Sequence, residues 1–192
     1  CLLRPIGLLH NRLPGRQEGD ASMANNGYMT ITGKAQGLIS AGCSSQDSIG
    51  NKCQSGHIDE IMVLSYTHNM VNIGNINKPT HRPILITKNV DKSSPLLAQA
   101  LSSREEIKCT INFYRVSSFG LQEKFYSVSI NGGGIADLTL EMPHVILHHD
   151  AEPQEHIAIR YRDKVATRRG FFFDRFADII TASTVYGACN TP

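Results

Sequence analysis

The densest group of side chains with chemical potential is a run of His148, His149 and Asp150, with His144 and His156 close by in the sequence. Imidazole and carboxylate groups are common ligands of transition metals, so the run suggests a metal-dependent hydrolase. Adjacent residues of an extended chain point to opposite sides, however, and this run falls in a polar connection between two predicted strands. We therefore favour a solvated surface segment. A metal-dependent hydrolase using His148, His149 and Asp150 is therefore the weakest alternative, and it would require stoichiometric metal.

Other catalytic patterns are missing from the sequence. It contains no Gly-x-Ser-x-Gly elbow that would expose a nucleophilic serine. The triple glycine at 132–134 lacks the Lys-Ser/Thr of a phosphate-binding loop, so we expect a turn between strands or a bulge there. A small basic cluster is formed by Arg160, Arg162, Arg168 and Arg169. A solvated edge or a subunit contact explains that cluster better than an anion site. The sequence therefore predicts neither an enzyme nor a bound cofactor or metal.

Composition limits the classes of protein that the 192 residues can form. The hydrophobic fraction of 41% is enough for one domain with a packed core, and charged residues make up only 19%. A net charge of +2 provides no large positive field, so we expect no nucleic-acid partner. The five cysteines form no Cys-x-x-Cys pair, which favours reduced structural thiols. No stretch approaches the roughly twenty apolar residues that cross a bilayer, so we predict no membrane insertion.

The two ends of the chain differ from its middle. Residues 1–22 show no periodicity, and Met23 is placed as a translation start, so we hypothesise that they are a non-native or disordered leader. We assign residues 23–167 to the working domain and residues 168–192 to an atypical C-terminal extension. A short amphipathic helix is predicted in that extension from apolar residues at about helical spacing: Phe173, Phe176, Ala177 and Ile180.

The elements between the two ends are mostly strands. Short segments rich in β-branched residues, several of them alternating apolar and polar, are separated by turn residues, which is typical of a β-barrel or a two-sheet sandwich. The predicted strands are Tyr28–Thr32, Ile61–Tyr66, Ile84–Thr87, Ile107–Arg115, Lys124–Ile130, Ile135–Leu140 and His156–Arg162. The predicted fold class is therefore mainly β.

A single helix and a single long loop complete the prediction. Ser94 is placed to cap the helix, and Pro95 suits its first position, where a missing N–H has no cost. The apolar face of this helix consists of Leu96, Leu97, Ala100 and Leu101. The segment Asn69–Pro83 is rich in Asn, Gly and Pro, so we expect it to project as an extended loop.

Several of these segments resemble the hemolysin-coregulated protein (Hcp) family, the tube-forming proteins of bacterial type VI secretion. The similarity covers residues 24 to about 163, in matching order and spacing. It rests on Gly33–Ser45 with Asp47–Lys52, on Thr87–Leu97, on Phe113–Arg115 with Gln122–Tyr126, and on Ile159–Tyr161.

The resemblance implies a two-sheet β-barrel with one short helix and a protruding loop, assembled as a hexameric ring. Rings would stack into a hollow tube that is exported from the bacterial cytoplasm without a cleaved signal peptide. The implied partners are further copies of the chain, effectors, and the spike and sheath components. The loop would contact neighbouring subunits through Asn69, Met70, Val71, Asn72, Ile73, Asn75, Lys78 and Pro79. No catalytic residue is implied.

One segment departs from the family pattern. In the family the last strand after the Arg-Tyr pair continues with an aromatic residue, often Trp, whereas 163–169 is polar and Trp is absent. We therefore expect a missing or replaced final strand, which would leave an unpaired sheet edge. The alternative function is accordingly an Hcp-like paralogue that binds an effector or a receptor without forming a tube.

Overall fold

The computed structural model describes residues 25–53, 55–72, 80–149, 151–170 and 180–186. The expected leader, residues 1–22, lies outside the described residues, as do Phe173, Phe176 and Ala177 of the expected C-terminal helix. Ile180 is described, and it begins a strand instead of a helix.

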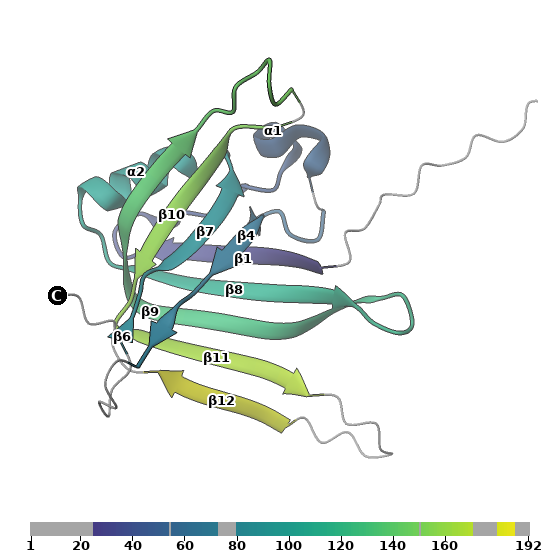
Figure 1. Ribbon diagram of the computed structural model, residues 1–192, viewed down its shortest axis with the longest axis vertical. Helices are drawn as coiled ribbons and strands as arrows, with labels where there is room; N and C mark the ends of the chain where they lie inside the picture. Colours follow the sequence, from purple (N-terminus) through teal and green to yellow (C-terminus); the bar gives the residue numbers. More distant parts are fainter. Residues whose placement is uncertain (1–24, 54, 73–79, 150, 171–179, 187–192) are drawn as a thin grey trace, which may run out of the picture.

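Antiparallel strands dominate the fold (Figure 1), which confirms the predicted mainly β class. The strands are β1 (Asn25–Gly33), β2 (Gly37–Leu38), β3 (Ile61–Val63), β4 (Ser65–Thr67), β5 (Met70–Val71), β6 (Thr80–His81), β7 (Ile84–Asn89), β8 (Ile107–Val116), β9 (Gln122–Glu141), β10 (Gln154–Arg160), β11 (Asp163–Gly170) and β12 (Ile180–Tyr186). The helices are α1 (Gln46–Ile49), the 3-10 turn η1 (Gly50–Lys52) and α2 (Ser94–Ser102).

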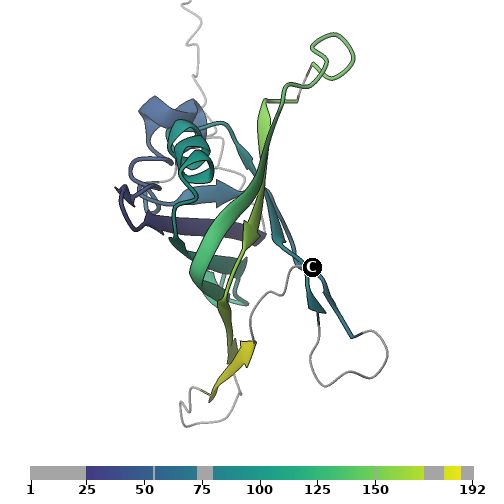
Figure 2. The ribbon, with the colours of Figure 1, turned by 90° about the vertical axis from the view of Figure 1, so that its left-hand side faces the viewer.

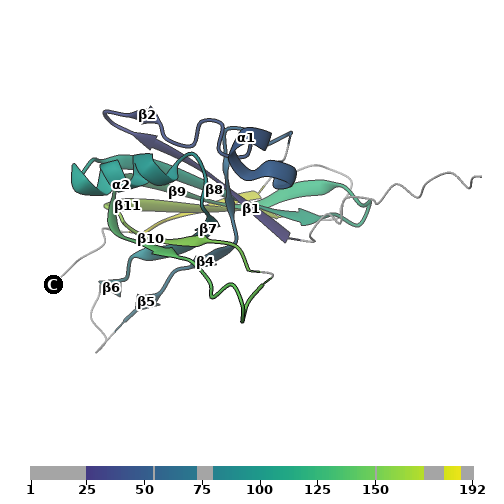
Figure 3. The same cartoon turned by 90° about the horizontal axis from the view of Figure 1, so that it is seen from above.

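Ten of these strands form two connected sheets that share β9. Sheet A contains β1, β8, the first part of β9, β11 and β12, with β2 and β3 also paired to β1. Sheet B contains the second part of β9, β10, β7 and β4. The two sheets lie as separate layers in Figure 2, and Figure 3 shows α2 lying beside the sheets.

Strand β9 passes from sheet A to sheet B at the triple glycine. Asn131 pairs with β11, and Gly134 already pairs with Arg160 of β10. Gly132 has a φ of 59°, and a Cβ on Gly133 would lie 3.3 Å from the carbonyl oxygens of Ile107 and Arg160. The predicted turn between two strands is therefore wrong. The glycines instead allow one strand to bend, with register shifts on both sides, which agrees with the alternative of a bulge.

A second crossing between the sheets occurs within the predicted strand Ile61–Tyr66. This segment forms two strands, because β3 pairs with β1 in sheet A and β4 pairs with β7 in sheet B. Leu64 lies at the break, and its N–H donates to the Thr87 carbonyl over 2.8 Å. The chain therefore changes sheets at Leu64.

The core lies between the sheets and under α2. Alternate residues of β8 are buried, which matches the period of two seen in its sequence. The fully buried side chains come from both sheets and from α2: Met29, Ile31, Ile84, Ile86, Leu97, Ile111, Val128, Ile157 and Ile159. This arrangement fits the predicted two-sheet sandwich.

Helix α2 begins beside a buried lysine. Ser93, not Ser94, is the N-cap, and Pro95 is the second helical residue. Ser94 Oγ instead accepts a hydrogen bond from the Asp91 N–H over 3.1 Å. The Lys88 ammonium lies 2.8 Å from both Asp91 Oδ1 and Glu155 Oε2, with no exposed side-chain surface on Lys88. These ion pairs join β7, β10 and the start of α2.

Two further expectations need correction. The sequence predicted a single helix between the two ends, but the structure adds the short segments α1 and η1. The polar segment 163–169 forms most of β11, which pairs with β9 on one side and with β12 on the other. The expected unpaired edge at this segment is therefore wrong, because backbone pairing does not require the apolar pattern that the sequence lacks. Among the described residues, neither helix is long and apolar enough to cross a membrane.

Candidate functional site

The predicted subunit-contact loop begins and ends in a short hairpin. Strand β5 pairs with β6, with Met70 opposite His81 and Val71 opposite Thr80. The Arg82 N–H donates to the Asn69 carbonyl over 3.0 Å and continues the ladder. Figure 2 shows this hairpin projecting away from both sheets.

The structure describes half of the loop residues that the sequence singled out. Asn69, Met70 and Asn72 are exposed, and Val71 is partly buried. Met70 keeps 43% of its surface exposed, which is a large fraction for an apolar side chain. The other predicted contact residues lie outside the described residues: Ile73, Asn75, Lys78 and Pro79.

A polar cluster connects the base of this hairpin to the sheets. The Tyr161 hydroxyl lies 2.7 Å from His68 Nε2 and 2.7 Å from His81 Nδ1. The Lys164 ammonium lies 2.9 Å from His68 Nδ1. His81, Tyr161 and Lys164 are each less than 5% exposed, and His68 is partly buried. No sequence pattern indicated this cluster, although Tyr161 belongs to the family-like segment Ile159–Tyr161.

The hydrogen bonds of the cluster run in one direction, from Lys164 through His68 and Tyr161 to His81. An ammonium group can only donate, so Lys164 fixes His68 Nδ1 as an acceptor. The neutral ring of His68 then carries its proton on Nε2 and donates to the Tyr161 oxygen. Tyr161 in turn donates its hydroxyl proton to His81 Nδ1. Both imidazoles must be neutral for this chain of hydrogen bonds to be complete.

Electrostatics also favours the neutral imidazoles. Burial, followed by the charge of Lys164 and the proximity of His81, lowers the pKa of His68 to about 4. Burial and Lys164 lower the pKa of His81. Burial alone lowers the pKa of Lys164. At neutral pH the cluster therefore holds the hairpin through hydrogen bonds between neutral rings and a single ammonium.

The histidine run does not form a comparable site. His144, His148 and His149 are exposed in the connection between β9 and β10, and Asp150 lies outside the described residues. His156 is instead positioned on β10 by Thr87 Oγ1 and Glu141 Oε2, each at 3.1 Å. Within the described part of the chain, no three His, Cys, Asp or Glu residues come together in a way that could hold a metal ion.

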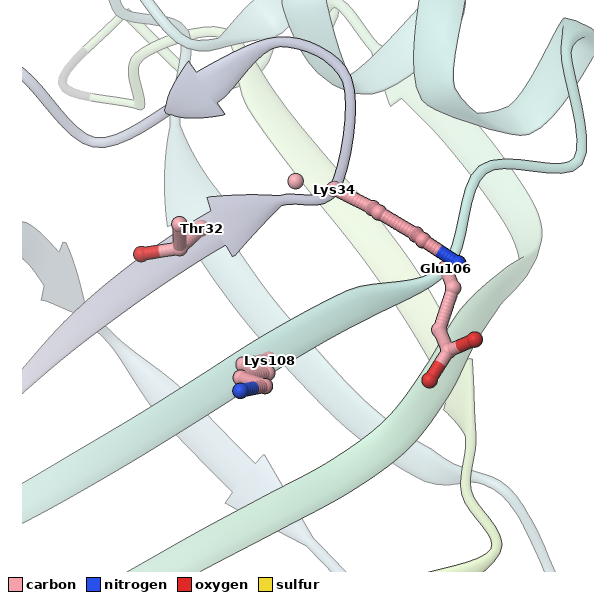
Figure 4. Close-up of a pocket in the computed structure, with 5 residues that line it drawn as sticks. Thr32, Lys34, Glu106 and Lys108 are labelled. Carbon is pink, nitrogen blue, oxygen red and sulfur yellow. The ribbon is translucent and has the colours of Figure 1, made fainter.

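A surface depression of about 380 Å³ lies beside the end of β1 and the start of β8. Figure 4 shows Thr32 and Lys108 on these neighbouring strands, with Lys34 and Glu106 at the rim. Glu106 Oε1 accepts a hydrogen bond from Arg162 Nη2 over 3.2 Å, which places one member of the predicted basic cluster at an exposed ion pair. The described residues of the lining provide a hydroxyl but no imidazole to activate it, so they offer polar contacts without a histidine base beside the hydroxyl.

Comparison with known proteins agrees with the geometry. The family model described as "Type VI secretion system effector, Hcp" matches residues 28–167. The chain is 42% identical over 123 residues to the "Major exported protein" of Pseudomonas aeruginosa, covering 60% of this chain and 72% of that protein. Among solved structures, it is similar to an Hcp protein crystal structure, with a TM-score of 0.76, 27% identity, and coverage of 88% of this chain and 100% of that one.

A second solved structure gives the same result at higher identity. The secreted protein Hcp3 from Pseudomonas aeruginosa superimposes with a TM-score of 0.71 and 35% identity, over 86% of this chain and 99% of that one. The family model spans most of both sheets, without β12, together with α2 and the hairpin base, including His68, His81, Tyr161 and Lys164. This chain therefore belongs to the Hcp family of type VI secretion proteins.

Proposed function

We propose that the chain is a structural subunit of the type VI secretion tube, which assembles as hexameric rings that stack and carry effectors out of the cell. The observation that carries this proposal is the structural match over 100% and 99% of the length of two solved Hcp chains. The name of the Pseudomonas aeruginosa relative, a major exported protein, supports export of this chain as well.

The projecting hairpin supports self-association. A two-stranded hairpin is only marginally stable alone in water, and this one places Met70 in solvent at its start. The buried cluster at its base fixes its direction without covering its surface. A hairpin held in this way is suited to pack against another subunit, so we assign the subunit contact to it.

Further partners and localisation follow from the same proposal. The partners are other copies of the chain, the effectors carried in the ring, and the spike and sheath components. The subunit would be made in the bacterial cytoplasm and exported without a cleaved signal peptide. The alternative is an Hcp-like paralogue that binds an effector or a receptor without building a tube.

The test is the native mass of the full chain, measured by light scattering after size exclusion over a range of concentrations. We expect a mass near six times the 21.1 kDa of one subunit. Met70→Asp should lower that mass, because it places a charge in the contact. Met142→Asp is the matched control, since Met142 is also an exposed methionine but lies outside the hairpin. A wild-type monomer at every concentration would refute the ring and favour the paralogue.

A further inference from the structure

The polar cluster at the hairpin base consists of titratable side chains: two imidazoles, a phenol and an ammonium. His68, two residues before β5, and His81, in β6, both approach the Tyr161 hydroxyl, and their ring centroids lie 5.8 Å apart. Tyr161 and Lys164 belong to the β10–β11 connection and to β11, so they come from the body of the sandwich. The hydrogen bonds of the Tyr161 hydroxyl to the hairpin base therefore involve two titratable rings.

We propose that the cluster of His68, His81, Tyr161 and Lys164 is an acid-operated latch, which holds the β5–β6 hairpin in its projecting direction at neutral pH and releases it when the imidazoles are protonated. The ligand that operates this latch is the proton itself. The inference deepens the proposed function, because its effect on assembly rests on the hairpin being the subunit contact, although the release itself is a property of a single chain.

Protonation would break the chain of hydrogen bonds at two points. A proton on His68 Nδ1 removes the acceptor that faces Lys164 at 2.9 Å and places two cations at that distance. A proton on His81 Nδ1 removes the acceptor of the Tyr161 hydroxyl. Neither loss can be repaired by tautomer exchange, because a charged imidazole has no acceptor left.

The described charge nearest the two rings, the Lys164 ammonium, favours their neutral form. Lys164 adds a like charge that disfavours protonation of both rings, and each imidazole faces the other through Tyr161. On β9, the residue paired with Lys164 is the apolar Ile130, and on β12 it is Tyr186. Tyr161 also contributes, after burial and Tyr126, to the raised pKa of Tyr66. The charged residues that flank the cluster in sequence are exposed: Arg82, Arg160, Arg162 and Asp163.

The sign and the pH range follow from linkage. A histidine whose folded pKa is depressed binds fewer protons in the closed state, so closure is favoured above the ordinary pKa of about 6.5 and weakens as the pH falls. With a closed-state pKa of about 4 for His68, the open fraction at pH 4.5 would rise about 70-fold relative to pH 7.5. His68 is only partly buried, so we expect a rise on the order of tenfold.

The experiment is hydrogen–deuterium exchange of the full wild-type chain at pH 7.5 and pH 4.5, with each peptide normalised to the unfolded chain at the same pH. We expect the normalised exchange of peptides covering β5 and β6 to rise about tenfold at pH 4.5. Peptides from β8 should stay protected, which separates local release from acid unfolding. Unchanged exchange in the hairpin, or equal loss of protection in β8, would overturn the latch.

Neutral isosteres provide the matched variants. The His68→Gln/His81→Asn double substitution places an amide near His68 Nε2 and near His81 Nδ1, the two nitrogens that face Tyr161. Neither amide can be protonated in this range, so the hairpin should show the same normalised exchange at both pH values. His148→Gln, in the exposed connection, should keep the wild-type response. A double variant that still responds to acid would also overturn the proposal.

Failure of the latch and failure of the ring are distinguishable. Exchange reports the hairpin within each chain, whereas light scattering reports assembly. Acid release of the hairpin in a chain that is monomeric at neutral pH would sustain the latch and refute the ring. A hexamer at pH 7.5 whose hairpin does not respond to acid would sustain the ring and refute the latch.

Discussion

Replacing Lys88 with methionine should destabilise the protein strongly, although Lys88 belongs neither to the hairpin nor to the polar cluster at its base. Its ammonium is fully buried and lies 2.8 Å from the carboxylates of Asp91 and Glu155, whose side chains are 4% and 5% exposed. It also donates to the Asn89 carbonyl and to Ser94 Oγ. Methionine preserves most of the volume but leaves two carboxylates buried without their cation.

The expected magnitude comes from the cost of breaking a buried ion pair on one side. That cost is about 3–5 kcal/mol, because the remaining charge keeps its desolvation penalty and loses its partner. Since a domain of this size is stable by roughly 5–15 kcal/mol, the loss is a large share of the total. The melting temperature should fall by about 6–20 °C, at roughly 2–4 °C per kcal/mol.

Urea unfolding followed by circular dichroism at pH 7 measures this change. Lys92→Met is the matched control, because Lys92 is an exposed lysine in the connection between β7 and α2, and its loss should stay within about 0.5 kcal/mol. Glu155→Gln keeps an acceptor near the ammonium and should cost less than Lys88→Met. A Lys88→Met loss below about 1 kcal/mol would refute the reasoning, since it would mean that water reaches the carboxylates.

Two other substitutions test the core and the turn after β1. Ile111→Ala should cost about 2–5 kcal/mol in urea unfolding because its side chain is fully buried, whereas Leu121→Ala, at 70% exposure, should cost little; equal losses would contradict the assignment of the core. Glu105 accepts hydrogen bonds from the backbone N–H groups of Ala35 and Gln36 and from the Gln36 side chain, and its pKa is lowered chiefly by Gln36. Its contribution is therefore present above the ordinary carboxyl pKa and is lost as the pH falls through the lowered value, so the difference in urea midpoint between wild type and Glu105→Gln should shrink from pH 7 to pH 3; a constant difference would count against it.

The strands and α2 could be predicted from local patterns because each pattern reflects burial on one face. Alternation in Ile107–Arg115 follows directly from the sheet, and Pro95 marks the start of α2 to within one residue. The cap was misplaced because Ser93 and Ser94 are chemically alike. The carboxylate of Asp91, which accepts from Ser93, decides between them.

The course of β9 and the pairing of β11 could not be predicted in the same way. Three glycines in a row are typical of a turn, and only the pairing of β9 with β10 and β11 shows that the strand continues. The polar residues of β11 carry no alternation, yet their backbone groups find partners on both sides. Hydrogen bonding between backbones leaves little trace in residue type.

The polar cluster at the hairpin base could not be predicted from the sequence for a different reason. His68 lies 93 residues from Tyr161 and 96 residues from Lys164 in the sequence, so no spacing rule joins them. The histidine run at 144–149 drew attention instead, because its members are adjacent. Tyr161 and Lys164 are close in the sequence, but the burial of these two polar side chains is evident only in the fold.

The central claim is that this Hcp family member builds rings, and electron microscopy of the purified full chain at neutral pH tests it most directly. Class averages should show open rings with six equivalent subunits and, at high concentration, stacks of such rings. Isolated particles of single-subunit size at all concentrations would contradict the account, and would leave a family member that binds its partners without forming a tube.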